Sequence, residues 1–423
     1  MSSDHYFVIK SDRELISEEF IENSNQCSFG VYLEHDKNLT DDWTLTTRLF
    51  HINEPFFMKS ERWCRQHVTL DCDCDCIKTR KRKRIKNLYL DNLDCYEIRM
   101  IEKIVEEGKR RGFLKTQVGT IDNSIAEEAA QLVKCFNCSS EFKSIMLTNL
   151  FHSCINIDHY LIPRNASFQV EEVGVGLKRL RAILAPNQDS NLNHVVGDRF
   201  LIIIDPPWSS KSVKRKHSYE IQSNGAILDM CKNLAPILDL IVEAQLKRYK
   251  KINLKVSIWT TKKQKLFVEE KMIPSLNCTL EDRLLWHKVT KSGHSVKVRG
   301  SAEYLLIGSY KTDPPEEVAQ TESLRRCQKV RDGILISIPS AIHSHKPSLP
   351  RDLIWPDAEV SVSNWNQTPI TDETLTSNKL PSPFNGIEVY ARCLQSGFHS
   401  IGFECIKLQR KELYEKNEKV VKS

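Results

Sequence analysis

The residues best suited to chemistry are Asp205, Pro206, Pro207 and Trp208, which directly follow the apolar run Phe200–Ile204. Asp and Pro are disfavoured inside strands, so this tetrad predicts a rigid corner at a strand end. A carboxylate and a nearby backbone carbonyl there could accept both hydrogens of an exocyclic amine, with their directions set by the proline ring. The aromatic ring offers a face on which a flat base can stack. The alternative is a plain rigid turn with a packed tryptophan.

Cations follow this corner and also occur far upstream. Lys211, Lys214, Arg215 and Lys216 could contact phosphates, which need point charges rather than sequence readout. Residues 78–86 contain seven cations in nine positions, a pattern typical of nuclear import or nucleic-acid binding. The alternative for each run is a solvated loop, because the net charge of +6 is too small to establish a polyanion partner.

The 14 cysteines do not form a convincing metal motif. Cys72, Cys74 and Cys76 alternate with aspartates near His67, and residues 135–138 form a lone CxxC. A structural zinc site usually has two spaced ligand pairs, so we expect reduced intracellular thiols and no metal site. The N-terminus has no apolar signal segment, and no run is apolar enough to span a membrane.

From residue 151 the pattern alternates between apolar strands and helices, which predicts an α/β fold with a mainly parallel sheet covered on both faces. In such a sheet ligands bind beyond the carboxyl ends of the strands, where Asp205 lies. The expected strands are Tyr160–Ile162, Phe200–Ile204, Leu254–Trp259, Tyr304–Ile307, Ile334–Ile338 and Ile387–Ala391, with helices at Ile221–Lys250 and Lys262–Met272.

The predicted organisation has four parts. Residues 1–95 form a partly β-structured region with a basic loop, and 96–150 a helical segment. The α/β domain covers 151–412, with a surface loop at 357–386, and residues 413–423 are a charged tail expected to fray. Within the helical segment, an apolar stripe predicts a helix from Tyr96 to Arg111, closed by Gly112. A capping box from Ser124 to Glu127 predicts a second helix.

Five segments in order, DPPWSSKSVKRKHSY, IWTTKKQK, GSAEYLLIG, SIPSAIHSHKP and VYARCLQSGFHSIGFECIKLQ, resemble the N6-adenine methyltransferases that carry a DPPW motif. The likeness covers roughly residues 75–410. It implies a Rossmann-like sheet, S-adenosylmethionine as cofactor and methylation of adenine N6 in nucleic acid.

The resemblance also implies roles for individual residues. Asp205 and the Pro206 carbonyl would hold the adenine N6, and Lys346 would meet the cofactor carboxylate. The implied catalytic residues are Asp205, Pro206, Pro207 and Trp208. The implied cofactor-binding residues are Glu172, Val173, Asp205, Lys346, Arg392, Phe403 and Glu404. The implied substrate-binding residues are Trp208, Ser210, Lys211, Lys214, Arg215 and Lys216.

Two positions depart from the family pattern. Phe403 stands where an asparagine usually binds the cofactor ribose, and Glu172 stands where the acid is usually an aspartate. Without one polar bond to the ribose, cofactor binding would be weaker by about tenfold at most. The alternative is that Phe403 packs into the core beside Ile401 and Ile406.

The substrate that the resemblance implies is 2′-O-methyladenosine within U2 small nuclear RNA, which would become N6,2′-O-dimethyladenosine. DNA adenine is the alternative, and a third possibility is a non-catalytic nucleic-acid-binding member of the family. We expect an active monomer located in the nucleus, with a cytoplasmic or mitochondrial pool left open.

Neutralising Lys211, Lys214, Arg215 and Lys216 together should weaken nucleic-acid binding and flatten its salt dependence. For a single strand, the slope of log K against log salt should fall by about 0.7 for each phosphate that is no longer neutralised. Binding titrations at several salt concentrations measure this slope, and an unchanged slope would show that these cations face solvent.

Overall fold

The computed structural model describes residues 6–10, 27–33, 38–40, 43–45, 95–115, 145–148, 155–157, 160–163, 165–185, 197–208, 222–249, 253–296, 303–311, 330–340, 342, 345–355 and 384–416. Several predicted features lie outside these ranges. They are the basic run 78–86, the cysteine clusters, the helix expected after Ser124 and most of the loop 357–386.

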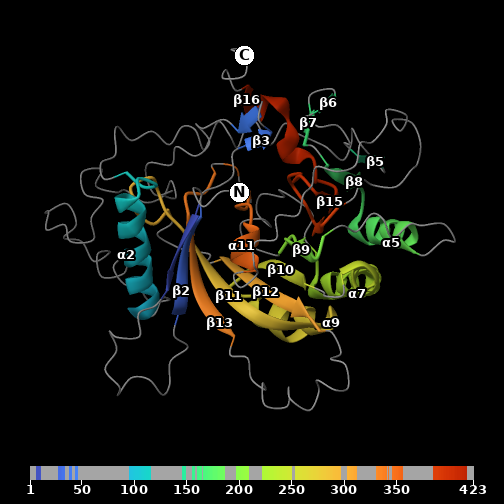
Figure 1. Cartoon of the computed structure of the whole chain (residues 1–423), viewed down its shortest axis with the longest axis horizontal. Helices are drawn as coiled ribbons and strands as arrows, with labels where there is room; N and C mark the ends of the chain where they lie inside the picture. The colour runs from blue at the N-terminus through green and yellow to red at the C-terminus, as the bar shows by residue number, and fades with distance from the viewer. Residues whose placement is uncertain are drawn as a thin grey trace, which may run out of the picture.

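In the described part of the chain, one sheet of 11 strands forms the centre of an α/β fold (Figure 1). Its spatial order is β1 (Tyr6–Lys10), β2 (Cys27–Leu33), β13 (Arg331–Ser337), β11 (Cys278–Lys288), β12 (Glu303–Tyr310), β10 (Asn253–Thr261), β9 (Arg199–Ile204), β14 (Gly386–Val389), β15 (Phe398–Ile401), β8 (Ser167–Val170) and β5 (Ile145–Thr148). From β10 to β8 all neighbours pair in parallel, as do β11, β13 and β2. The sheet is therefore mainly parallel, with β12 running antiparallel between β10 and β11. This confirms the predicted Rossmann-like α/β class.

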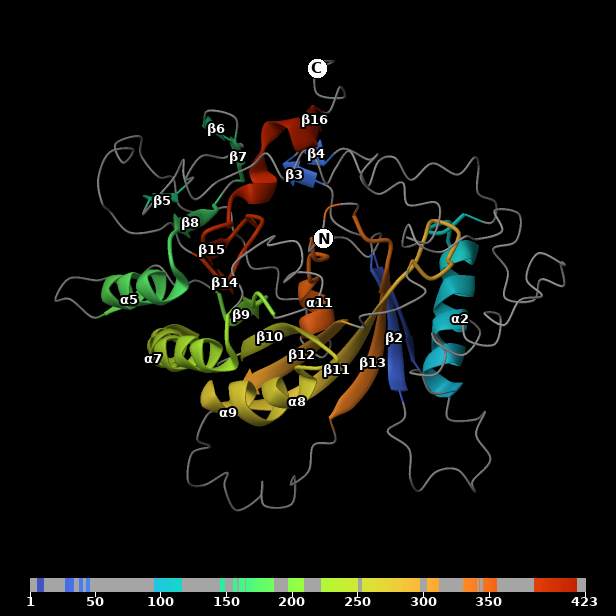
Figure 2. The same cartoon turned by 180° about the vertical axis from the view of Figure 1, so that it is seen from behind.

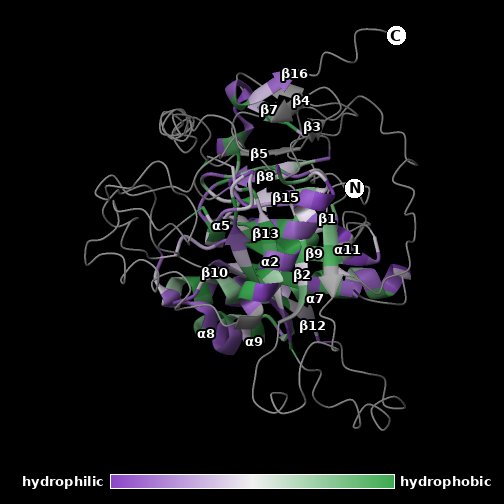
Figure 3. Cartoon of the chain, turned by 90° about the vertical axis from the view of Figure 1, so that its left-hand side faces the viewer, coloured by the Kyte–Doolittle hydropathy of each residue, from purple (hydrophilic) through white to green (hydrophobic). Residues whose placement is uncertain are grey.

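The sheet is buried on both faces, as strand β9 shows, because it is apolar from Phe200 to Ile204. In β9, Phe200, Ile202 and Ile204 join one core cluster, whereas Leu201 and Ile203 join another. The first face is covered by α5 (Val173–Leu184), α7 (Asn224–Tyr249) and the helical segment α8 (Lys265–Phe267), η7 (Val268–Met272) and α9 (Ile273–Ser275). The second face is covered by α11 (Arg351–Ile354) and Trp355, which pack with Trp259 and Trp286 of the sheet. Figure 3 shows the resulting hydrophobic colour concentrated in the middle of the molecule.

The N-terminal strands belong to this same sheet, because β2 pairs in parallel with β13 and β1 pairs with β2. The predicted amphipathic helix is present as α2 (Cys95–Arg110), and it packs on β2 and β13 at the end of the sheet far from α5 (Figures 1 and 2). Gly112 ends the helix in the left-handed region with φ of 81°, where glycine carries no Cβ penalty. The boundary at residue 151 stays a prediction, but these strands and that helix share a core with the later strands.

Three expectations need correction. Tyr160–Ile162 is a strand, β7, but it pairs with β6 (Ile155–Ile157) outside the central sheet. Strands β8, β11 and β15 were not expected, because polar and apolar residues are mixed in them. The start of the expected frayed tail is ordered, since β16 (Tyr414–Lys416) pairs with β4 (Trp43–Leu45), which also pairs with β3 (Asn38–Thr40). The partner strand is far away in sequence, so the tail alone could not indicate it.

None of the helices in the described residues is long and apolar enough to cross a membrane.

Replacing Gly30 with Ala should destabilise the fold by about 1–3 kcal/mol, the usual cost of overpacking a core. A Cβ at Gly30 would lie 2.4 Å from Cδ1 of Ile104 and 2.9 Å from Sδ of Met100, both buried residues of α2. Chemical denaturation measures the change. The control is Gly225→Ala in α7, where the nearest atom lies 3.7 Å away and we expect no loss of stability. Equal effects would show that α2 does not pack tightly on β2.

Candidate active site

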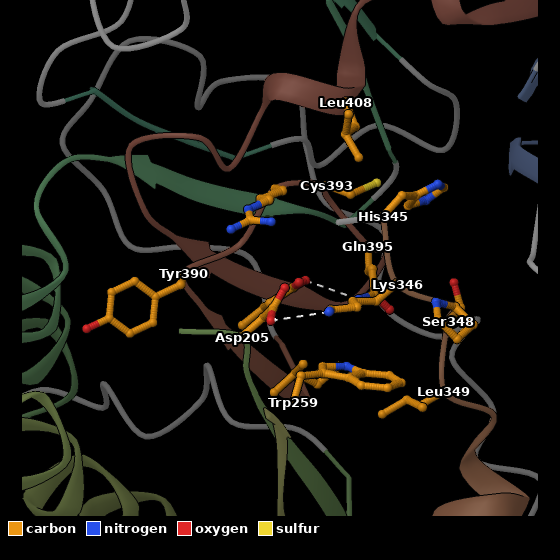
Figure 4. A pocket seen from close by; sticks show the side chains of 14 residues that line it. Asp205, Trp259, His345, Lys346, Ser348, Leu349, Tyr390, Cys393, Gln395 and Leu408 are labelled. Carbon is orange, nitrogen blue, oxygen red and sulfur yellow. Dashed lines mark hydrogen bonds and ion pairs between the residues drawn. The ribbon is translucent and has the colours of Figure 1, made fainter. Parts of the chain in front are cut away.

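Asp205 lies at the carboxyl end of β9, as the sequence predicts. Its backbone N–H donates to the Val389 carbonyl oxygen of β14 at 3.3 Å, so it continues the strand pairing by one residue. Its residue surface is only 8% exposed, and it lines a pocket at this edge of the sheet (Figure 4). The described residues that line the pocket are Ile203, Asp205, Trp259, His345, Lys346, Pro347, Ser348, Leu349, Glu388, Tyr390, Arg392, Cys393, Gln395 and Leu408.

The corner after Asp205 is closed by local hydrogen bonds. The Trp208 backbone N–H donates to the Pro206 carbonyl oxygen at 2.7 Å, and the Gln222 N–H donates to the Pro207 oxygen at 3.4 Å. A carbonyl oxygen has two lone pairs, so the Pro206 oxygen can accept a second hydrogen bond.

The Trp208 side chain points into the core instead of offering an open face. It is 6% exposed, and its indole N–H donates to the Trp259 carbonyl oxygen at 2.8 Å. Its ring meets the Phe267 ring edge-on, with centroids 6.4 Å apart. Trp208 therefore connects the corner to β10 through this hydrogen bond. Its buried ring does not support the expected role of stacking on a base.

Lys346 reaches Asp205 from the segment that follows β13. Its Nζ lies 3.6 Å from Oδ1 of Asp205 and also donates to Oε2 of Glu303. Burial disfavours the charged form, but the carboxylates of Asp205 and Glu303 outweigh it and hold the pKa of Lys346 above the ordinary lysine value. Lys346 is therefore a cation at neutral pH, directed at the pocket. Lys346 was expected at this site from the sequence, whereas Glu303 was not.

Glu388 is a pocket residue that the sequence analysis missed. It belongs to β14 beside β9, and its Oε2 accepts a hydrogen bond from Nε2 of Gln395 at 3.1 Å. Burial raises the pKa of this carboxyl to about 8, despite the Gln395 hydrogen bond and the Arg392 charge that lower it. Glu388 is thus mainly protonated at pH 7 and can donate as well as accept. The sequence signal that could have indicated this residue is that Glu388 is the one acid within the otherwise apolar strand β14.

Tyr390 is held in a strained backbone conformation at the rim of the pocket. Its φ is 60°, which is uncommon for a residue with a bulky side chain. Its hydroxyl donates to Oε1 of Gln222 at 2.7 Å, and Gln222 in turn bonds to Pro207. Tyr390 therefore links the end of β14 to the corner that follows Asp205.

The remaining predicted cofactor residues divide into two groups. Arg392 lines the pocket, and its Nε lies 3.5 Å from Oε2 of Glu404, so these two residues form an ion pair. Glu172 instead caps α5, accepting from the N–H groups of Gly174 and Val175 at 2.9 Å each.

Val173 and Phe403 are not among the residues that line the pocket. Val173 is buried in the core beneath the sheet, at 4% exposure. Phe403 is 44% exposed, so the idea that it packs into the core beside Ile401 and Ile406 is wrong. Ser210, Lys211, Lys214, Arg215 and Lys216 lie outside the described residues.

The pocket residues fit one end of S-adenosylmethionine. The Lys346 ammonium and the Arg392 guanidinium are suitable partners for an α-carboxylate. The protonated Glu388 and the Gln395 amide add hydrogen-bonding groups that carry no net charge near pH 7. No grouping of three or more His, Cys, Asp or Glu suited to a metal ion occurs within the described ranges.

Comparison with known proteins agrees with this geometry. The family model named MT-A70 matches residues 200–355, which begin with β9 and include Asp205, Glu303 and Lys346. This segment is therefore similar to an MT-A70 domain. This confirms the resemblance to N6-adenine methyltransferases that the sequence predicted.

Relatives extend the likeness beyond that domain. The chain is 28% identical over 348 residues to the N(6)-adenine-specific methyltransferase METTL4 of Mus musculus, covering 74% of this chain and 64% of the mouse protein. It is 27% identical to the DNA N6-methyl methyltransferase of Caenorhabditis elegans, covering 51% and 48% of the two chains. It is 26% identical to the N6-methyladenosine RNA methyltransferase MTA1 of Cryphonectria parasitica, covering 51% and 54%. The chain spans between about half and two thirds of the length of these relatives.

The raised pKa of Glu388 predicts a pH-dependent cost to stability. The folded state keeps a proton that the unfolded chain releases above its ordinary pKa of 4.5, so stability falls as the pH rises from about 4.5 to about 8. Glu388→Gln cannot ionise and should not show this loss. Its melting temperature should therefore exceed that of the wild type by an amount that grows between pH 5 and pH 8.

Thermal melts across this pH range test the prediction, with Glu106→Gln on the exposed face of α2 as the control for removing a negative charge. A constant difference between the Glu388→Gln variant and the wild type would show that Glu388 is ionised in the fold.

Proposed function

We propose that this protein transfers a methyl group to the N6 of adenine in nucleic acid. The observation that carries the proposal is the Asp205 carboxylate at the end of β9, which faces a pocket with Lys346 and Arg392. Asp205 and Lys346 lie within the residues that the MT-A70 model matches. S-adenosylmethionine, when bound, supplies the methyl group. Lys346 and Arg392 would hold its carboxylate.

The chain's own contribution is to orient the amine. An adenine N6 lone pair is delocalised into the ring, which makes it a poor nucleophile. The Asp205 carboxylate and the free lone pair of the Pro206 oxygen can accept its two hydrogens and favour a more pyramidal, more reactive nitrogen. The amine gives up one proton on methylation, and Asp205 is placed to take it.

RNA is the first candidate substrate, specifically 2′-O-methyladenosine within U2 small nuclear RNA. Its support is the resemblance stated above and the basic runs, which also favour a nuclear location. DNA adenine is the second candidate, because one relative, 27% identical, is named as a DNA methyltransferase and another, 26% identical, is named as an RNA methyltransferase. We propose a monomer as the active form.

Asp205→Ala should reduce methyl transfer by at least about a thousandfold, because loss of a group that orients and stabilises the reacting centre has costs of this order. The measurement is mass spectrometry of nucleosides from RNA and DNA incubated with the protein and isotope-labelled cofactor. Both polymers carry adenine, so the same assay decides between the two substrates.

The matched control is Asp239→Asn on α7, an exposed carboxylate that accepts from the Tyr310 hydroxyl at the opposite edge of the sheet. This variant should keep wild-type turnover. Near-normal turnover of Asp205→Ala with an unchanged melting curve would exclude Asp205 from the reaction. A wild-type protein that modifies neither polymer would exclude the proposed function.

A further inference from the structure

Lys346 has two carboxylate neighbours, and it favours the one that is not at the reaction centre. Its Nζ forms a hydrogen-bonded ion pair with Glu303, whereas the nearest oxygen of Asp205 lies 3.6 Å away. A distance of 3.6 Å permits Coulombic attraction but is too long for a hydrogen bond. The two residues form an ion pair (Figure 4), but this lysine does not use the Asp205 oxygens as hydrogen-bond acceptors.

Glu303 is itself held in place by the sheet. It is the first residue of β12 and lies between Thr261 of β10 and Trp286 of β11. Its second oxygen, Oε1, accepts from Nζ of Lys288 at 2.5 Å. The pKa of Glu303, which burial alone would raise, is driven well below its usual range by the ammonium groups of Lys288 and Lys346. Glu303 is therefore a fixed negative charge between two cations.

Two tryptophan rings confine the lysines on this side. Nζ of Lys346 lies 5.2 Å from the Trp259 ring centroid and 5.5 Å from that of Trp286, and Nζ of Lys288 lies 3.9 Å from the Trp286 ring. Cation–π attraction acts in the same direction as the Glu303 ion pair. The side chains of Lys346, Glu303 and Lys288 are between 17% and 19% exposed, so water competes weakly for these interactions.

We infer that Glu303 is a positioning residue that keeps the Lys346 ammonium off Asp205, so that the Asp205 oxygens remain free to accept hydrogens from the substrate amine. The inference rests on the proposed function. Among the described residues, the carboxylate that stays in ion-pair contact with Lys346 once Glu303 loses its charge is Asp205. Lys346 would then donate to Asp205 and occupy the acceptor that orients the amine.

The test compares Glu303→Gln, Lys346→Met and the double variant with the wild type. Turnover is measured at saturating cofactor on the oligonucleotide that the wild type methylates, and cofactor binding is measured by calorimetry. Glu303→Gln should lower kcat by about tenfold or more, equivalent to the removal of one hydrogen bond, while cofactor affinity changes less. In the Lys346→Met background the same substitution should change kcat by less than about twofold, because the lysine it restrains is absent.

The matched control is Glu281→Gln, which removes the carboxylate from a comparable ion pair with Lys255 at the other end of the sheet. This pair has an N–O distance of 2.8 Å and side chains 13% and 21% exposed. The Glu281→Gln variant should leave kcat unchanged. Equal losses in both glutamine variants, or independent losses from Glu303→Gln and Lys346→Met, would mean that Glu303 acts only as a structural ion pair.

A structural measurement separates this inference from the proposed function. Crystal structures of the wild type and Glu303→Gln should show Nζ of Lys346 moving from its present distance to within about 3.2 Å of an Asp205 oxygen. A lysine that stays in place would overturn the inference, whether or not the wild type is active. If Glu303→Gln folds poorly, Glu303→Gln with Lys288→Met removes one charge of each sign and should show the same movement.

Discussion

The pocket depends on how the charge of Asp205 is balanced at the end of β9. A carboxylate on a side chain that is only 12% exposed needs a nearby cation, because transfer of an isolated charge out of water is costly. Lys346 supplies that cation at 3.6 Å, yet it makes its hydrogen bond to Glu303. Asp205 is therefore compensated electrostatically while it keeps its acceptor capacity.

This balance depends on elements from distant parts of the chain. Asp205 follows β9, Glu303 begins β12, Lys288 ends β11 and Lys346 follows β13. Because β12 runs antiparallel to β10 and β11, its first residue lies at the same edge as their last residues. The mixed pairing of the sheet is thus what brings a second carboxylate to the site. A fully parallel sheet would place the first residue of that strand at the opposite edge.

The carboxyl groups at this edge differ in protonation because their surroundings differ. Glu303 has two ammonium partners and a lowered pKa, whereas burial leaves Glu388 with a pKa of about 8. Near pH 7 the Glu388 carboxyl is therefore mainly protonated and can donate a hydrogen bond. The nearby carboxylates of Asp205 and Glu303 instead have a cationic partner in Lys346. Such contrasting environments are typical of sites that handle protons. Tyr390, with its strained backbone, adds a mechanical link from β14 to the corner.

The sequence by itself determined the elements whose signal is local. The apolar run before Asp205, the stripe of α2 and the stop at Gly112 each reflect short-range periodicity or backbone freedom, and all three are present. Asp205, Lys346 and Arg392 could be predicted as site residues because they lie in segments that resemble the family's motifs in the same order. The structure brings all three to one pocket.

Only the tertiary structure decided the rest. The burial of Trp208, the exposure of Phe403 and the partners of Glu303 depend on residues distant in the chain. The same holds for β16 and for the N-terminal strands, which become part of a sheet only through pairing with remote strands. Side-chain burial and the pKa of Glu388 are properties of the packed environment, and no local sequence pattern encodes which strands will surround a given carboxyl.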